Sequence, residues 1–221
     1  MKILVTGGAG YIGSHTIIEI LQKTNWDVIS IDDYSTSSEK TYDRIEAITG
    51  KKVSFYKVDL KDYNELLKII RSYKDIGGII HFAAHKWVGD SVENPLKYYE
   101  NNLGGLTNIL KLQTECNIPN FIFSSSCSVY GDITALPVTE KSELNTAESP
   151  YAYTKQVGEK MILDYINSEK EKKAISLRYF NPVGAHNSGQ IGEIQPIPNN
   201  LLPYITQSAI GIIDGFTVYG D

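Results

Sequence analysis

The feature that most constrains this chain is a glycine-rich turn between a short apolar run and a helical pattern. The run Lys2–Thr6 leads directly into Gly7-Gly8-Ala9-Gly10-Tyr11-Ile12-Gly13, where a helix is expected to open. In such a turn the first glycine allows a tight bend, a glycine without a side chain lets a pyrophosphate approach, and the last permits close packing of helix on strand. The free N–H groups at the start of the helix favour phosphate. The spacing between the first two glycines of the pattern, Gly7 and Gly10, is wider than in the usual fingerprint. The strand before the turn and the helix after it are nevertheless those expected around a dinucleotide site. An ordinary strand–helix turn is the alternative.

An acid at the end of the next strand-like run bears on the choice of dinucleotide. Asp32 lies near the distance from Gly13 at which a ribose-binding carboxylate is expected. A carboxylate there accepts hydrogen bonds from the ribose hydroxyls and repels a 2′-phosphate, which favours NAD over NADP. Asp33 is adjacent and could share this role; a solvated acid at a strand end is the alternative.

The remainder of the chain alternates short apolar runs with longer helical patterns. The strand-like runs are rich in Ile, Val and Phe, as strands buried on both faces should be, and they cover Lys2–Thr6, Asp27–Ile31, Val53–Val58, Gly78–Ala83, Asn120–Ser125 and Ala174–Tyr179. The helical patterns cover Tyr11–Lys23, Asp62–Tyr73, Pro95–Cys116 and Pro150–Asn167. This alternation predicts an α/β fold, a Rossmann-like doubly wound parallel sheet with helices on both faces.

The pattern changes after Tyr179. The stretch 181–199 is rich in Gly, Pro, Asn and Gln, and a helical candidate at 200–213 and a strand candidate at 216–219 follow it. We therefore expect an NAD-binding domain at residues 1–180 and the start of a smaller second region at 181–221. Because the chain stops at Asp221 without a polar tail, we expect that the rest of this second domain is missing.

Composition excludes several classes of protein. The net charge of −5 over 221 residues argues against a nucleic-acid partner. No apolar run is long enough to span a bilayer, and the N-terminus lacks the pattern of a secretion signal. The only cysteines, Cys116 and Cys127, are too few for a disulfide framework and fit a reducing cytoplasm. We expect a cytoplasmic protein with no nucleic-acid and no membrane partner.

A tyrosine and a lysine stand four residues apart at the start of a predicted helix. Tyr151 and Lys155 therefore share one face. An ammonium beside a phenol favours the phenolate and lowers the pKa of the tyrosine. Such a tyrosine can take a proton from an alcohol while hydride leaves the same carbon. With 15 tyrosines in the chain such a pair can arise by chance, but this pair follows the serine-rich strand end Ser124–Ser126, where ligands lie in a doubly wound sheet. Ser126 could bind the same substrate oxygen.

Several segments together resemble the extended short-chain dehydrogenase/reductases, and within them the UDP-glucose 4-epimerases. They are Thr6–His15, Ser124–Ser126 with Val129–Gly131, Tyr151 with Lys155, Leu177–Ala185, and Pro198–Leu201, which is similar to the uridine-nucleotide loop of that family. The resemblance covers essentially the whole chain. It implies an isomerase of galactose metabolism that interconverts UDP-glucose and UDP-galactose. The implied steps are hydride transfer to bound NAD, rotation of a 4-keto sugar and return of the hydride. A homodimer formed through the helices at 95–116 and 150–167 is also implied.

The resemblance assigns roles to individual residues. Ser126, Tyr151 and Lys155 would be catalytic. The implied cofactor-binding residues are Gly7, Gly10, Tyr11, Ile12, Gly13, Asp32, Asp33, Asp59, Leu60, Phe82, Ala83, Ala84, Lys86, Asn101 and Phe180. The implied UDP-sugar-binding residues are Lys86, Ser126, Tyr151, Asn181, Asn200, Leu201, Thr217 and Tyr219.

The chain departs from the family pattern at Ala84, where a glycine is frequent. Family members also continue past Asp221 with groups for the diphosphate and the sugar. A nucleotide-sugar 4,6-dehydratase is the nearest rival, but such enzymes place adjacent Asp and Glu where this chain has Cys127 and Ser128. A UDP-glucuronate decarboxylase is similarly disfavoured, whereas an epimerase of N-acetylated hexoses is not excluded. A non-catalytic NAD-binding protein usually lacks the tyrosine–lysine pair. His81 and His85 have metal-ligand spacing without a third ligand, so no metal site is expected.

Overall fold

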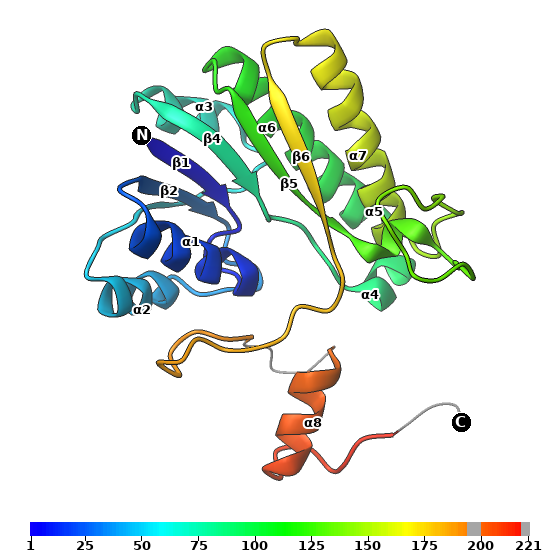
Figure 1. Ribbon diagram of the computed structural model, residues 1–221. Coiled ribbons are helices and arrows are strands. Elements are labelled where there is room, and N and C mark those ends of the chain that lie inside the picture. Colours follow the sequence, from blue (N-terminus) through cyan, green and yellow to red (C-terminus); the bar gives the residue numbers. More distant parts are fainter. Residues whose placement is uncertain (194–199, 218–221) are drawn as a thin grey trace.

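The centre of the molecule is a six-stranded sheet (Figure 1). The computed structural model describes residues 1–193 and 200–217. The strands lie in the order β3-β2-β1-β4-β5-β6, and all neighbouring pairs are parallel. Their bounds are β1 Lys2–Thr6, β2 Asp27–Asp32, β3 Ser54–Lys57, β4 Ile76–His81, β5 Asn120–Ser126 and β6 Lys173–Tyr179. The doubly wound parallel sheet predicted from the sequence is confirmed.

Helices cover both faces of this sheet. The α-helices of the described residues are α1 Tyr11–Lys23, α2 Lys40–Thr49, α3 Tyr63–Arg71, α4 Val88–Glu93, α5 Pro95–Tyr98, α6 Gly105–Glu115, α7 Pro150–Ser168 and α8 Leu201–Ala209. The buried side chains form two clusters: α1 and α2 pack on one face of the sheet, and α3, α6 and α7 pack on the other. The central strand β1 shows why two layers are needed, because Ile3 and Val5 belong to the first cluster while Leu4 between them belongs to the second.

The carboxyl ends of the strands meet along one edge. Thr6 of β1 pairs with His81 of β4, and Ser126 of β5 pairs with Tyr179 of β6. The chain winds from β1 outward to β3 and then returns to the other side of β1 with β4. In open parallel sheets a ligand binds in the crevice outside the strand ends where the order reverses in this way. That point lies between β1 and β4.

Some elements differ from the sequence-based expectation. The helix predicted over Pro95–Cys116 consists of α5, a π-helical turn at Tyr99–Gly104 and α6. The helices α2 and α4 were not predicted, because α2 buries only Thr41, Tyr42 and Ile45 and α4 only Ser91, too few for a clear apolar period. The strand candidate at 216–219 lies partly outside the described residues, and Phe216 and Thr217 do not form a strand.

Beyond β6, residues 181–193 cross below the carboxyl edge of the sheet towards α1 and α2 (Figure 1). Helix α8 follows, lies apart from the sheet in this view, and buries none of its side chains. The chain thus leaves the sheet after Tyr179, close to residue 180, where a domain boundary was expected; the boundary itself stays a prediction.

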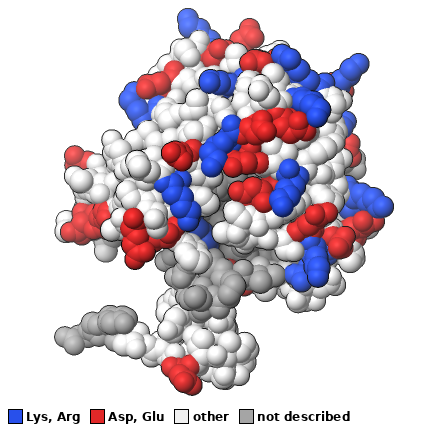
Figure 2. Space-filling model, turned by 180° about the vertical axis from the view of Figure 1, so that it is seen from behind, with Lys and Arg blue, Asp and Glu red and all other residues white. Residues whose placement is uncertain are grey.

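Charges of both signs are interspersed on the face that Figure 2 shows. The surface ion pairs of the protein include Lys68 with Glu65 and Arg71 with Glu115. A nucleic-acid-binding face would carry a basic stripe, and the face in view carries none. Among the described residues, no helix is both long and apolar enough to cross a membrane.

Candidate active site

The glycine turn lies at the crevice between β1 and β4. Gly7 has a φ of +72°, and a Cβ atom there would lie 2.6 Å from the backbone nitrogen of Ala83. A Cβ at Gly13 would lie 2.2 Å from the Gly7 carbonyl oxygen. Both positions therefore need glycine even without a ligand. Gly7 needs it for its left-handed backbone, and both need it because the backbone packs closely around them.

Gly10 differs from these two glycines. It is the N-cap of α1 with a φ of −73°, and a Cβ there would meet only the Gly7 carbonyl oxygen, at 3.2 Å. Helix α1 begins without a side-chain cap and without an acid in its first turn. The backbone N–H groups at this end are therefore suited to an anionic ligand that approaches a bare glycine.

Asp32, at the end of β2, binds the glycine turn directly. Its carboxylate accepts hydrogen bonds from the backbone nitrogens of Ala9 and Tyr34, both at 2.9 Å, and from the Ser37 hydroxyl at 2.8 Å. Burial raises the pKa of this carboxyl, and the hydrogen bonds act in the opposite direction. Asp33 instead accepts from the backbone nitrogen and hydroxyl of Ser35 and is more exposed.

After β3 the chain passes Asp59 and Leu60. The Leu60 side chain is buried in the core, and its carbonyl oxygen accepts a hydrogen bond from Asn108 of α6 at 2.9 Å. The Asp59 carboxylate accepts from the backbone nitrogen of Lys61 at 2.8 Å. Of these two residues, therefore, only Asp59 directs its side chain towards solvent.

The segment after β4 forms the other wall of the crevice. Phe82 donates its backbone N–H to Thr6, and Ala83 lies against Gly7. Lys86 forms an ion pair with Glu193 at 3.1 Å. His81 is buried, and burial lowers its pKa to about 3. No group of three or more possible metal ligands occurs among the described residues.

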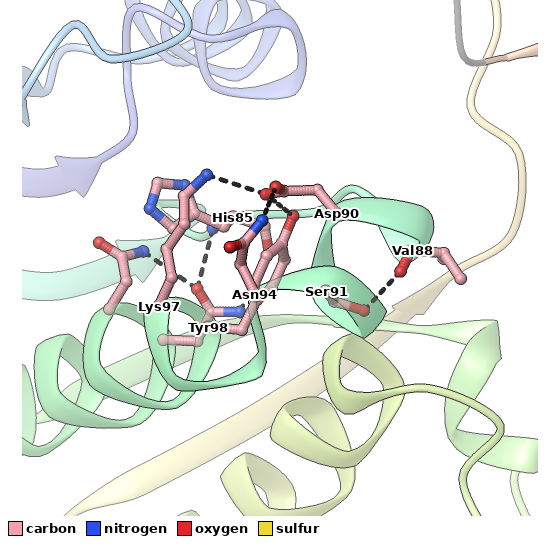
Figure 3. A network of polar contacts seen from close by, with 9 residues as sticks. His85, Val88, Asp90, Ser91, Asn94, Lys97 and Tyr98 are labelled. Carbon is pink, nitrogen blue, oxygen red and sulfur yellow. Dashed lines mark hydrogen bonds and ion pairs between the residues drawn. The ribbon is translucent and has the colours of Figure 1, made fainter.

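A polar network holds this wall in place (Figure 3). The Asn102 side chain accepts from the backbone nitrogen of His85 at 2.9 Å and donates to its carbonyl oxygen at 3.0 Å. The ring of Tyr98 lies 5.6 Å from that of His85, and its hydroxyl donates to Asp90 at 2.9 Å. Asn101, the residue predicted to hold the cofactor, donates to Asn102 at 3.0 Å. Asn102 was not predicted from the sequence, although its place beside Asn101 is a signal.

Ser126, Tyr151 and Lys155 lie near one another at the carboxyl ends of β4–β6. Ser126 ends β5, and Tyr151 and Lys155 lie in the first turns of α7. Helix α7 begins here because the Ser149 hydroxyl caps the N–H of Ala152 and Pro150 occupies the first turn. The Lys155 ammonium donates to the Ser124 carbonyl oxygen at 2.7 Å and lies 5.8 Å from the centre of the Tyr151 ring. The structure thus brings the three residues together.

The acid–base properties of this group differ from the expectation that the lysine lowers the pKa of the tyrosine. Burial raises the pKa of Tyr151, while a hydrogen bond with Ser126 acts in the opposite direction. Burial lowers the pKa of Lys155 to about 8, against the effect of Glu159. In the protein without its ligands the pKa of Tyr151 is therefore raised overall, contrary to the expected lowering, because burial outweighs the effects of its neighbours.

The residues predicted to bind the sugar nucleotide are less enclosed. Phe180, which was predicted to bind the cofactor, is also exposed, and its ring lies 6.3 Å from that of Tyr130. Asn200 donates to Glu193, which links it to the Lys86 wall of the crevice. Of the other residues predicted to bind the sugar nucleotide, Asn181, Leu201 and Thr217 are exposed. Tyr219 lies outside the described residues. Asn200 is therefore held near the crevice through Glu193, whereas the side chain of Leu201 is exposed on the surface of α8.

Fold and glycine turn together define a Rossmann-like protein whose strand ends are suited to a dinucleotide. The chain belongs to the NAD dependent epimerase/dehydratase family, whose model matches residues 3–210. It is 45% identical to a UDP-glucose 4-epimerase of Erwinia amylovora and 47% identical to UDP-glucose 4-epimerase uge1 of Schizosaccharomyces pombe. The alignments cover 100% and 99% of this chain, but only 65% and 62% of those relatives.

Solved structures of UDP-glucose 4-epimerases have a fold similar to that of this chain. A UDP-glucose 4-epimerase from Bifidobacterium longum, in complex with NAD+ and UDP, matches with a TM-score of 0.95 and 42% identity, over 100% of this chain and 66% of that one. An enzyme of the same name from Stenotrophomonas maltophila, with bound NAD and formylated UDP-arabinopyranose, matches with a TM-score of 0.96 and 38% identity, over 100% and 65%. The chain thus spans about 65% of the length of the curated relatives.

Proposed function

We propose that this chain is the NAD-binding and catalytic part of a UDP-glucose 4-epimerase, an isomerase that interconverts UDP-glucose and UDP-galactose in galactose metabolism. The observation that carries the proposal is the grouping of Ser126, Tyr151 and Lys155 at the carboxyl edge of the sheet that also holds the glycine turn. The names of the relatives supply the substrate.

The residues around the crevice fit NAD. The open approach at Gly10 and the uncapped start of α1, at Tyr11 and Ile12, suit a pyrophosphate. Asp32 is a buried carboxylate beside that turn and would accept from the adenosine ribose while repelling a 2′-phosphate. The other residues proposed to hold NAD are Gly7, Gly13, Asp33, Asp59, Leu60, Phe82, Ala83, Ala84, Lys86, Asn101 and Phe180.

The catalytic residues would manage the proton of the sugar 4-hydroxyl. When bound, NAD supplies the hydride acceptor and donor for C4 of the sugar. Tyr151 takes the 4-hydroxyl proton and returns it after the 4-keto sugar has rotated in the site. The Ser126 hydroxyl, whose hydrogen bond with Tyr151 counteracts the rise that burial causes in the tyrosine pKa, would also bind the sugar 4-oxygen. Lys155, held by the Ser124 carbonyl, adds positive charge beside the phenol and favours the phenolate.

The substrate would lie between this group and the segment after β6. Lys86, Asn181, Asn200, Leu201, Thr217 and Tyr219 are proposed to bind the UDP-sugar, with Ser126 and Tyr151 at the reacting carbon. Residues 1–180 would form the NAD-binding domain, and 181–221 would begin the UDP-sugar-binding region. The link from Asn200 through Glu193 to Lys86 supports this placement.

Two further proposals concern the assembly and the compartment. A homodimer would form through α5, α6 and α7, and the exposed side chains of Leu96, Tyr153 and Leu163 on these helices support it. A cytoplasmic location is supported by the two cysteines, Cys116 and Cys127, which are both free.

Replacement of Tyr151 tests the assignment. Tyr151→Phe should lower the turnover of UDP-galactose, measured without added NAD, by about a hundredfold or more while NAD stays bound. Tyr153→Phe is the matched control, because Tyr153 is two residues away on α7 and 51% exposed. Near-normal turnover by Tyr151→Phe, or equal losses in both variants, would contradict the proposal.

A further inference from the structure

The segment 184–193, here called the strap, is attached to both walls of the crevice between β1 and β4. The hydroxyl of Tyr11, at the start of α1, donates to the Gly184 carbonyl oxygen at 2.6 Å. At the other end, the Glu193 carboxylate pairs with the Lys86 ammonium at 3.1 Å. Because Tyr11 follows β1 and Lys86 follows β4, the strap joins the two sides of the point where the strand order reverses.

The middle of the strap is packed into the domain. Ile191 is only 3% exposed and belongs to the apolar cluster of α1, α2 and the adjacent sheet. His186 donates its backbone N–H to the Ile191 carbonyl at 2.8 Å, which closes a turn. Arg44 of α2 donates to the Gln190 carbonyl at 3.3 Å. An apolar side chain removed from water at this point holds the strap to α1 and α2.

The end of the strap is held by charge. The Glu193 side chain is 8% exposed, and besides Lys86 it accepts a hydrogen bond from Asn200 at the N-cap of α8. A buried carboxylate is stable only where such partners surround it. Detaching the strap from the β4 wall would leave this carboxylate without its ammonium partner, so the closed arrangement is favoured.

We propose that the strap retains the dinucleotide, with Ile191 and Glu193 as the positioning residues that set how fast NAD leaves. This inference rests on the proposed function, which places NAD in the crevice. A cofactor beneath a segment tied to both walls can leave only after one attachment opens. Besides the hydrogen bonds of Tyr11 and Arg44, the strap is attached by the buried side chain of Ile191 and by the Glu193–Lys86 pair, and these last two can be removed by substitution within the strap.

Dissociation of the cofactor tests this proposal directly. The protein carrying this sequence is loaded with radiolabelled NAD, excess unlabelled NAD is added, and the bound label is followed over time. Ile191→Ala and Glu193→Gln should each release the label about tenfold faster, since such changes act mainly on dissociation. The two substitutions together should release it faster than either alone.

Matched variants separate retention from general weakening. Ile45→Ala removes the same atoms from the same apolar cluster, on α2, but leaves the strap attached. Glu65→Gln removes a glutamate that pairs with Lys68 on the surface of α3. Both controls should release label at the rate of the unaltered protein. If Ile191→Ala does not fold, Glu193→Gln decides alone.

Unchanged rates in the strap variants would overturn the proposal, as would equal acceleration by Ile45→Ala. Slower release from Glu193→Gln would also overturn it, because the freed Lys86 would then hold the cofactor better without the strap. Unaltered protein that binds no NAD would overturn the proposed function as well, a result distinct from equal rates among variants.

Discussion

Glu159 accepts two hydrogen bonds from the Arg178 guanidinium, at 2.9 Å from Nε and 2.7 Å from Nη2. The same carboxylate accepts from the Ser125 hydroxyl at 2.5 Å, and Arg178 also donates to the Tyr130 hydroxyl at 3.0 Å. This one ion pair therefore ties α7 to β5, to β6 and to the turn after β5. Glu159 lies one helical turn beyond Lys155 and acts to raise the pKa of that lysine.

Breaking this pair should weaken both the fold and the site. Both side chains are mostly buried, so Glu159→Ala leaves Arg178 without its counter-charge and should lower the free energy of unfolding by about 3 kcal/mol. Urea unfolding followed by circular dichroism measures this loss. Glu159→Gln should lose less, because an amide can still accept from Ser125.

The surface pair of Lys160 and Asp164 on the same helix is the control. Asp164→Ala should change the free energy of unfolding by less than about 1 kcal/mol, as expected for exposed ion pairs. A similar small effect for Glu159→Ala would mean that the Arg178 pair does not hold the strands and helix together.

The lowered pKa of Lys155 predicts a pH-dependent stability. The lysine loses its proton near pH 8 in the folded protein, against about 10.4 in an unfolded chain. Between these values the unfolded chain binds one more proton, so this residue makes the folded state more stable as the pH rises, by about 3 kcal/mol in all. Lys155→Met lacks this contribution.

The measurement compares unfolding of the unaltered protein and of Lys155→Met across this pH range. The difference in free energy of unfolding should move in favour of the unaltered protein as the pH rises from 8 to 10. Lys160→Met, at an exposed position of α7, should show no such trend. A constant difference for Lys155→Met would show that the lysine keeps an ordinary pKa in the fold.

The glycine turn predicts a contrast between two substitutions by alanine. Gly13→Ala would bring a Cβ to 2.2 Å from the Gly7 carbonyl oxygen and should lower the free energy of unfolding by at least about 2 kcal/mol. Gly10→Ala has an ordinary φ, and its only close contact would be the Gly7 carbonyl oxygen at 3.2 Å, so the free energy of unfolding of the ligand-free protein should fall by less than about 1 kcal/mol.

Gly10→Ala should show its effect when NAD is present. The methyl group at position 10 faces the space proposed for the pyrophosphate, so Gly10→Ala should weaken NAD binding about tenfold or more. Thermal unfolding with and without NAD reads out both effects. Undiminished stabilisation of Gly10→Ala by NAD would place the phosphates elsewhere.

Much of the fold could be predicted because its signals are local. The strand Lys2–Thr6, the glycine turn and α1 begin and end where the residues predict, and α7 begins at Pro150 as expected from its cap and proline. The π-helical turn at Tyr99–Gly104 has no comparable local signal. Neither do α2 and α4, whose few buried side chains acquire a partner only once the sheet is assembled.

By itself, the sequence determined the alternation of strands and helices, the glycine turn and the identities of Ser126, Tyr151 and Lys155. These depend on local periodicity and on residue chemistry. Only the tertiary structure decided that Lys155 is buried deeply enough for its pKa to fall to about 8. It also decided that Ile191 packs on α1 and α2, and that Glu193 reaches Lys86. Burial and contacts between residues far apart in the chain depend on how the elements pack, and packing is a property of the whole fold.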